Sequence, residues 1–343
     1  MADTVKIPKQ KKNKRNAVLF KEMTVDMKRP KIMLVMLIIN LLLIPVTASF
    51  FLGITIAAFG SIDYRVLAWY FIALVFCEMT LLAFITPAIT AGSISLEKER
   101  QTLDVLLTTR MTTWEIIKGK YLSDFIFLSL MVISTFPVLS IVFIYGGISF
   151  LQLLYIGVVL IVFIGFISCF GVFFSALTKN TILSVILTYL FLMIYLSVTF
   201  MLPIILLAVV AAINDALYYD NQLFAFITDP DFINGDLLIM LGTPNPIYMI
   251  YDVIGNTIGY NIEDVSVKGM ISIANSMPHI TDKNLLLKAW TPISMVEMIL
   301  MSLGLLRLSA VLLNPIKGKQ KPINNRKKNN KQPVKKVENG VQT

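Results

Sequence analysis

The sequence predicts an all-α polytopic membrane protein with six transmembrane helices. Hydrophobic residues make up 56% of its 343 residues and charged residues 15%, against roughly 45–50% and about 25% in soluble domains. The mean hydropathy is +0.75. The apolar residues gather in six runs of about 20 residues or more, the length that crosses a bilayer as a helix. A chain of this kind covers its apolar surface with lipid.

The predicted spans form five closely spaced runs and one separate run. They lie at residues 32–59, 66–94, 121–145, 148–177, 181–213 and 292–313. Four contain a proline in their interior, where neighbouring helices can satisfy the freed backbone groups and a kink is expected: Pro45, Pro87, Pro137 and Pro203. The fifth run would be about 50 Å long as one helix, against a hydrocarbon core of about 30 Å. We therefore expect it to break near Pro203.

Charge separates the two ends of the chain from one long internal segment. Residues 1–31 hold ten basic and three acidic residues (net +7), and residues 314–343 hold nine and one (net +8). Residues 214–291 hold three basic and nine acidic residues (net −6). Basic flanks of membrane helices stay in the cytoplasm. We therefore expect both termini inside, the 214–291 region outside, and a basic, disordered tail at 314–343.

The N-terminal segment is expected to remain attached as an anchor. The first apolar run is some 28 residues long, about twice the apolar part of a signal peptide. Before it, residues 18–27 mix apolar and charged side chains, which is typical of a short helix in the inner membrane interface. An irregular lead-in is the alternative. The basic tails favour a bacterial plasma membrane.

The loop between the second and third predicted spans, residues 95–120, is the most informative segment. Its sequence is SLEKERQTLDVLLTTRMTTWEIIKGK. Five residues recur at helical spacing and would share one face of a helix entering the cytoplasm: Leu96, Leu103, Leu106, Leu107 and Arg110. Thr112 or Thr113 can cap a second helix that rises into the third span. The pattern predicts a helix, a turn and a helix protruding at the inner face.

This loop resembles the signature of a known family. An acidic pair, Thr-Leu, Leu-Leu and Gly-Lys follow one another at Glu97 and Glu99, Thr102-Leu103, Leu106-Leu107 and Gly119-Lys120. The order is similar to the loop between the second and third helices of the permease subunits of ATP-binding cassette exporters, type-2 class. The plan of the chain is also similar to that family, with an interfacial helix, six spans and an external region before the last. Asn245-Pro246 resembles a short element of that region.

The resemblance implies a permease subunit of an ABC transporter, an exporter that works by alternating access as a homodimer or as a heterodimer with a related permease. The loop would form a coupling helix that docks on a separate ATPase chain, which holds ATP and magnesium. This chain would bind no cofactor and no metal, and would not be an enzyme. The residues expected to couple are leucines and a methionine for contact and charges for register: Leu103, Leu106, Leu107 and Met111, with Glu97, Glu99, Arg100 and Arg110. A solvated helix end with charge pairs is the alternative for the charges.

The sequence has no phosphate-binding loop of the form G-x-x-x-x-G-K-[ST]. Gly119-Lys120 is followed by Tyr121, and Gly318-Lys319 by Gln320. The ATPase is therefore expected on another chain. The apolar spans suit an amphipathic or lipid-like substrate, and an ion or a glycan is the alternative.

Two acidic residues within the predicted spans are further candidates for a substrate or proton path. Glu78 lies near the midplane of the second span, and Glu297 lies near the outer end of the sixth. Charged groups at membrane depth are costly and are functional candidates by default. A hydrogen-bonded carboxyl that packs helices is the other interpretation of Glu78.

Three other functional classes are the alternatives to an exporter. Membrane-embedded enzymes need histidine, serine or paired aspartate motifs, whereas this chain has one histidine, His279, and no H-E-x-x-H. The basic tails fit attachment to anionic lipids, so no nucleic-acid partner is expected. An ATP-independent channel, sensor or scaffold remains the alternative, and dependence on ATP separates it from an exporter.

Overall fold

The structure, a computed structural model, describes residues 18–20, 30–57, 64–107, 111–144, 149–219, 241–249 and 290–313. The chain divides into two units, Met1–Leu313 and Asn314–Thr343, and every described residue belongs to the first. These residues form helices and turns, with no strand among them. The all-helical fold class is confirmed.

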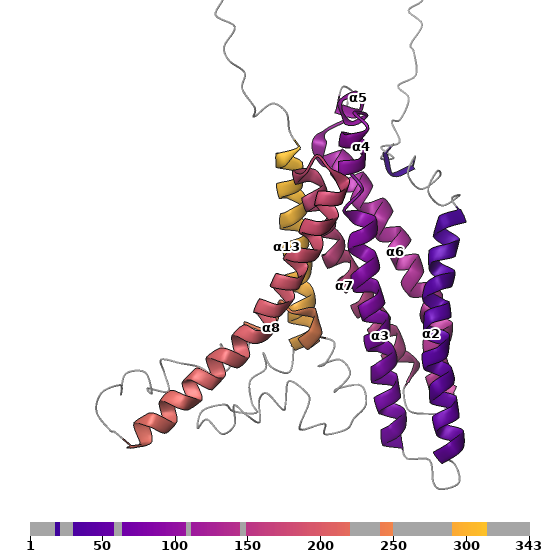
Figure 1. Ribbon diagram of the computed structural model, residues 1–343, viewed down its shortest axis with the longest axis vertical. Coiled ribbons are helices and arrows are strands. Elements are labelled where there is room, and N and C mark those ends of the chain that lie inside the picture. The colour runs from indigo at the N-terminus through magenta and orange to yellow at the C-terminus, as the bar shows by residue number, and fades with distance from the viewer. Residues whose placement is uncertain are drawn as a thin grey trace, which may run out of the picture. The chain divides into compact units, whose positions relative to one another are not determined.

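Six long helices and two short ones make up most of the described part of the chain (Figure 1). The long helices are α2 (Pro30–Ala57), α3 (Tyr64–Thr90), α6 (Thr113–Ile144), α7 (Phe150–Leu177), α8 (Thr181–Tyr219) and α13 (Trp290–Leu312). The short helices α4 (Ser95–Glu99) and α5 (Leu103–Leu107) lie between α3 and α6. Each predicted span therefore corresponds to one long helix.

Five helical stretches are long and apolar enough to cross a membrane, as in a multi-pass membrane protein. They are Ala73–Glu99, Thr113–Ile141, Phe150–Leu177, Thr181–Leu206 and Trp290–Leu312. The first predicted span is present as α2, of which Leu34–Ser49 forms a shorter apolar stretch. A sixth crossing stays a prediction.

Parts of the predicted organisation lie outside the described residues. Of the interfacial helix expected at 18–27, residues 18–20 are described and are helical. Of the region expected to be external, 214–291, the structure describes the end of α8, the segment 241–249 and the start of α13. The basic tail and His279 are not among the described residues.

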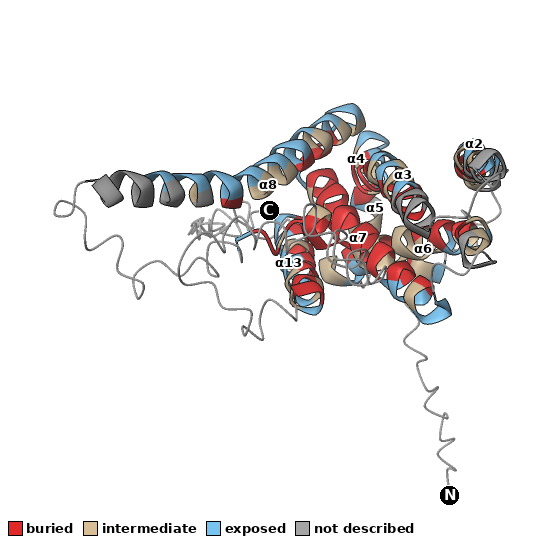
Figure 2. Ribbon diagram, turned by 90° about the horizontal axis from the view of Figure 1, so that it is seen from below, coloured by how far each residue is buried: buried red, intermediate tan, exposed pale blue. Residues whose placement is uncertain are grey.

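Helix α7 is the centre of the helix packing. It contacts α3, α6, α8 and α13, and Figure 2 shows the buried residues concentrated on it. A helix that is apolar on every face is stable where other helices surround it. Aromatic rings join α7 to α8: Phe170 lies 5.2 Å from Phe191 and 5.6 Å from Tyr195 between ring centroids.

Three glycines of α7 allow two neighbours to approach closely. A Cβ at Gly157 would overlap the Phe136 ring of α6, and a Cβ at Gly165 would lie 3.0 Å from Phe125 Cε2, also on α6. A Cβ at Gly171 would overlap the Thr90 side chain at the end of α3. Small residues of this kind are the usual means of close helix packing in membranes.

The expected break near Pro203 is wrong, because α8 is one helix of 39 residues that contains this proline. Side chains from the 241–249 segment bind α8 carbonyls close to the proline. The Asn245 amide donates to Leu196 O at 2.9 Å, and the Tyr248 hydroxyl donates to Phe200 O at 2.6 Å. The carbonyl that Pro203 leaves without a helical donor is Thr199 O, so these two bonds hold the 241–249 segment against α8 near the proline. Figure 1 shows α8 diverging from its neighbours along its length.

Candidate functional site

The 95–120 loop begins where α3 ends. After Thr90 the chain makes the turn 91–94 and then forms α4. The first backbone N–H groups of α4 have a fixed partner, since the Ser175 hydroxyl of α7 accepts from Ile94 N and Ser95 N at 2.8 Å each. Such N–H groups at a helix start have no partner within their own helix. The contact therefore fixes the start of α4 against α7.

The expected single helix through the first half of the loop is wrong. Helix α4 ends at Glu99 because Gln101 adopts a left-handed backbone conformation, with φ of 58°. Thr102 N donates to Glu97 O at 2.9 Å and Gln101 N donates to Lys98 O at 3.1 Å, the paired bonds of a Schellman motif. The chain reverses there, and α5 starts at Leu103.

The expected capping of the second loop helix is confirmed. Glu115 N donates to the Thr112 hydroxyl at 3.2 Å, and Thr112 N donates to Glu115 Oε2 at 2.9 Å. These reciprocal bonds form a capping box, so α6 begins at Thr113 and continues into the membrane stretch. Arg110 lies outside the described residues.

Lys98 connects α4 to the end of α7. Its ammonium donates to Thr178 O at 3.1 Å and to Ser175 O at 3.5 Å, and it also contacts Ala176 O. The last carbonyls of a helix lack partners within it and carry partial negative charge. A lysine placed there satisfies them, so Lys98 holds α4 against the C-terminal end of α7.

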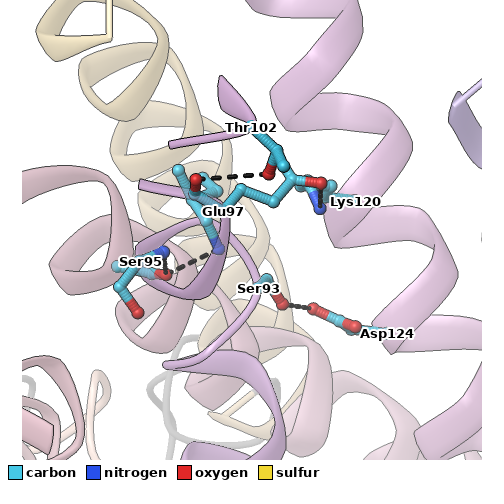
Figure 3. Close-up of polar contacts among 8 residues, drawn as sticks. Ser93, Ser95, Glu97, Thr102, Lys120 and Asp124 are labelled. Carbon is cyan, nitrogen blue, oxygen red and sulfur yellow. Dashed lines mark hydrogen bonds and ion pairs between the residues drawn. The ribbon is translucent and has the colours of Figure 1, made fainter. Parts of the chain in front are cut away.

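Glu97 connects α4 to α6. Its Oε1 atom lies 2.8 Å from Lys120 Nζ, and Figure 3 shows this pair beside the contact of Ser93 with Asp124. The Lys120 side chain is 5% exposed. A buried charge requires a partner of opposite sign. The ion pair therefore holds α4 and α6 in a fixed relation.

Glu99 connects α4 to the start of α8. Its Oε2 atom accepts from the Thr181 hydroxyl at 2.7 Å and from Thr181 N at 3.4 Å. A carboxylate at a helix N-terminus is favourable, because the exposed N–H groups carry partial positive charge. The three consecutive charges Glu97, Lys98 and Glu99 thus bind α6, α7 and α8 in turn.

The apolar residues of the loop pack into a core at this end of the helices. Leu103 is 7% exposed, and Leu106, Leu107 and Met111 are half-buried against the same core. The other buried members of this core lie in helices α6, α7 and α13, in the turn that follows α3, and at the residue that follows α13. They are Ile94, Ile116, Ile117, Cys169, Val172, Ala176, Leu306, Ala310 and Leu313. Leu103 was expected to contact a partner, but its position makes it part of the protein's own interior.

Exposed residues around the turn from α4 to α5 form a small surface that we call the loop tip. It consists of Leu96, Arg100, Gln101, Thr102 and Asp104. Leu96 is 40% exposed, and Arg100 lies four residues further along, on the same side of α4. The loop tip therefore combines an apolar side chain with charges of both signs.

Sequence reasoning missed two residues of this site. Lys98 was not singled out, because its partners lie about 80 positions further along the chain. Leu96 was placed on the apolar helix face but was not counted among the coupling residues. Its neighbours in a straight helix would have been Leu103 and Leu107, and the turn at Gln101 separates it from both.

Glu78 forms a polar contact between α3 and α6. The residue is fully buried, and its Oε1 atom contacts the Thr135 hydroxyl. A second polar pair lies close by in the sequence of α6, where the Asn40 amide of α2 donates to the Ser134 hydroxyl at 3.2 Å. Interhelical hydrogen bonds of this kind stabilise helix pairs in membranes. The structure thus shows a packing contact at Glu78.

Glu297 binds the segment 241–249. Its Oε2 atom accepts from the Thr243 hydroxyl at 2.6 Å. Asn245 of the same segment is fully buried and also donates to the Thr199 hydroxyl at 2.8 Å. Burial raises the pKa of the Tyr248 hydroxyl to about 12. Glu297 and Glu78 lie on different helices with different partners.

Among the described residues, no group of three or more His, Cys, Asp and Glu side chains is arranged to hold a metal ion. No known protein family matches the sequence, and no curated protein matches it. The features that bear on function are the 95–120 loop and the helices that it joins.

Proposed function

We propose that this chain is the membrane-spanning permease subunit of an ATP-driven exporter, and that its loop tip docks on a separate ATPase subunit. The observation that carries the proposal is the attachment of α4 to three membrane helices by consecutive charged residues. Glu97 binds Lys120 of α6, Lys98 binds the end of α7, and Glu99 binds the start of α8.

This attachment suits a part that transmits force. A partner that moved α4 would move the adjoining ends of α6, α7 and α8 with it, because hydrogen bonds and an ion pair join them. Packed helices change between discrete arrangements rather than deform continuously. A displacement of α4 would therefore shift the membrane helices between two packings, as alternating access requires.

The loop tip supplies the chemistry of a protein contact. Leu96 offers apolar area, while Arg100 and Asp104 offer charges that fix the register of a partner. In this proposal Glu97, Glu99 and Leu103 position the loop, Leu106, Leu107 and Met111 support it from below, and the exposed residues meet the ATPase. Arg110 is proposed as a further contact.

The remaining features complete the proposal. The chain would work as a homodimer or with a related permease in a bacterial plasma membrane, with both termini in the cytoplasm. The cargo would be amphipathic or lipid-like, because the described membrane stretches carry mainly apolar side chains. ATP and magnesium would bind to the partner ATPase.

Purification of the full chain from its native membranes in mild detergent tests this proposal. We expect an ATPase with a phosphate-binding loop to co-purify in stoichiometric amount and to hydrolyse ATP. A chain that purifies alone under several gentle conditions, without ATP hydrolysis, would favour the ATP-independent channel, sensor or scaffold.

A further inference from the structure

A cavity of about 200 Å³ lies between α6, α7 and α13. Its lining includes the aromatic side chains Tyr121 and Phe125 of α6, which stack with ring centroids 5.8 Å apart. Phe166 of α7 contributes a third ring. Gly165 lets these two α6 rings lie against the α7 backbone, since a Cβ there would lie 3.0 Å from Phe125 and 3.3 Å from the Tyr121 hydroxyl. The walls of the cavity are therefore mainly apolar, with three aromatic and five aliphatic residues among the ten that line it.

The few polar atoms of the lining are already engaged. The Tyr121 hydroxyl donates to Gly165 O at 3.4 Å, and the Tyr121 and Ser302 hydroxyls both bond to the Cys169 thiol. None of the lining residues is charged. A polar ligand would have to lose its water without gaining a charged partner, which is unfavourable. The lining therefore favours a hydrocarbon ligand.

The exposed residues at the rim of the cavity indicate from which side such a ligand would enter. Ile299 and Leu303 line the cavity and are 47% and 48% exposed, whereas Phe166 on its inner wall is 1% exposed. Ile299 and Leu303 belong to a helical stretch apolar enough to cross a membrane, so their exposed sides face hydrocarbon. From Ile299 to Leu306 the lining extends roughly 10 Å along α13. The cavity is narrow, elongated and open sideways.

We propose that this cavity binds the hydrocarbon chain of a lipid or lipid-like amphiphile, which enters from the bilayer between Ile299 and Leu303. The aromatic rings contact the chain, and its headgroup stays at the membrane surface. This binding does not require an ATPase, so it holds whether or not the loop tip docks on one. A bilayer phospholipid and a single-chain amphiphile share the chemistry that the cavity recognises.

The test uses photoactivatable probes on the full chain, reconstituted in vesicles of phosphatidylethanolamine and phosphatidylglycerol. One probe is a phospholipid with a diazirine in its acyl chain, and the other is a long-chain alcohol carrying the same group. Labelled positions are identified by mass spectrometry of peptides. We expect label on Phe166 and Phe125, because a side chain as buried as Phe166 is reached from within the cavity.

Two variants of α13 provide the comparison. Leu303→Trp fills the rim, whereas Leu300→Trp places the same group on a side chain that is 63% exposed and does not line the cavity. We expect Leu303→Trp to lower labelling of Phe166 about tenfold, equivalent to about 1.4 kcal/mol of binding. Leu300→Trp should leave it within about twofold of the wild type.

The outcomes separate the sources of the ligand. Labelling by both probes in proportion to their mole fractions supports a bilayer phospholipid, and preferential labelling by the alcohol supports a lipid-like amphiphile. The proposal is overturned if neither probe labels Phe125 or Phe166 in the wild type, or if Leu303→Trp is labelled there as strongly as Leu300→Trp. A monodisperse elution profile of each variant excludes misfolding as the cause of lost labelling.

Discussion

Lys120 Nζ and Glu97 Oε1 lie 2.8 Å apart, joining the first helix of the loop to the membrane helix that follows it. The lysine is almost wholly buried, and the glutamate is 21% exposed. The ion pair is therefore shielded from water on one side. The ion pair joins α4 directly to α6. A force applied to α4 would therefore also act on α6.

Removal of one partner of this ion pair should destabilise the protein. Lys120→Met and Glu97→Gln should each lower the free energy of unfolding by about 3 kcal/mol, because each removes an ion pair at a largely buried position. The exchange of Glu97→Lys with Lys120→Glu should restore part of the loss. Thermal unfolding in detergent measures all four proteins. Single variants within about 0.5 kcal/mol of the wild type would show that the pair does not stabilise the loop.

Lys98 should matter more for stability than Lys118, an exposed lysine of α6. Lys98→Met removes a charged donor from the carbonyls of Ser175 and Thr178 and should cost about 2 kcal/mol. The matched variant Lys118→Met changes an exposed lysine and should lie within about 0.5 kcal/mol of the wild type. The two are compared by unfolding midpoint and by proteolysis between α3 and α6. Equal stability of the two variants would contradict the role of Lys98 at the end of α7.

Replacement of Gln101 by glycine should stabilise the loop, because Gln101 has a backbone conformation that favours glycine. Gln101→Gly should stabilise the loop by about 1 kcal/mol, the cost of a left-handed conformation in a residue with a Cβ. Gln101→Val should destabilise it by at least as much, since a branched side chain tolerates this conformation poorly. Hydrogen exchange of residues 95–107 reports the change locally. An unchanged or faster exchange in Gln101→Gly would contradict the turn.

Two glycines of the membrane helices should respond oppositely to alanine. In Gly171→Ala the new Cβ would overlap Thr90 and lie 3.1 Å from Ala91 N. The variant must move α7 away from α3, which should lower the free energy of unfolding by about 2 kcal/mol. In Gly304→Ala the new Cβ meets nothing within 4 Å, and the better helix former should leave stability equal or slightly higher. The unfolding midpoints of the two variants are compared with that of the wild type. Tolerance of Gly171→Ala at wild-type stability would contradict the close contact of α3 and α7.

The helices were predictable from the sequence, because length and hydropathy determine them locally. The spans predicted at 148–177 and 292–313 match α7 and α13 within two residues at each end. The cap at Thr112 was also predictable, since a capping box is a pattern of four residues. These features depend on neighbours in the sequence.

The contacts of the loop were not predictable, because they depend on neighbours in space. Nothing in the run from Glu97 to Arg100 indicates that Lys98 meets the end of α7 or that Glu99 meets Thr181. Helical spacing placed Leu96 and Leu103 on one face, but a non-glycine residue in the left-handed conformation divides them. The contact of Asn245 with Leu196 O of α8 likewise joins residues 49 positions apart.

The most direct test of the central claim is a photoactivatable amino acid placed at Arg100 of the full chain and irradiated in native membranes. The account predicts a cross-link to one protein with a phosphate-binding loop, lost when Leu96→Glu and Asp104→Lys change the loop tip. The same amino acid at Leu300 should give no cross-link to that protein. Absence of such a cross-link at Arg100, or the same product from Leu300, would contradict the docking of an ATPase on the loop.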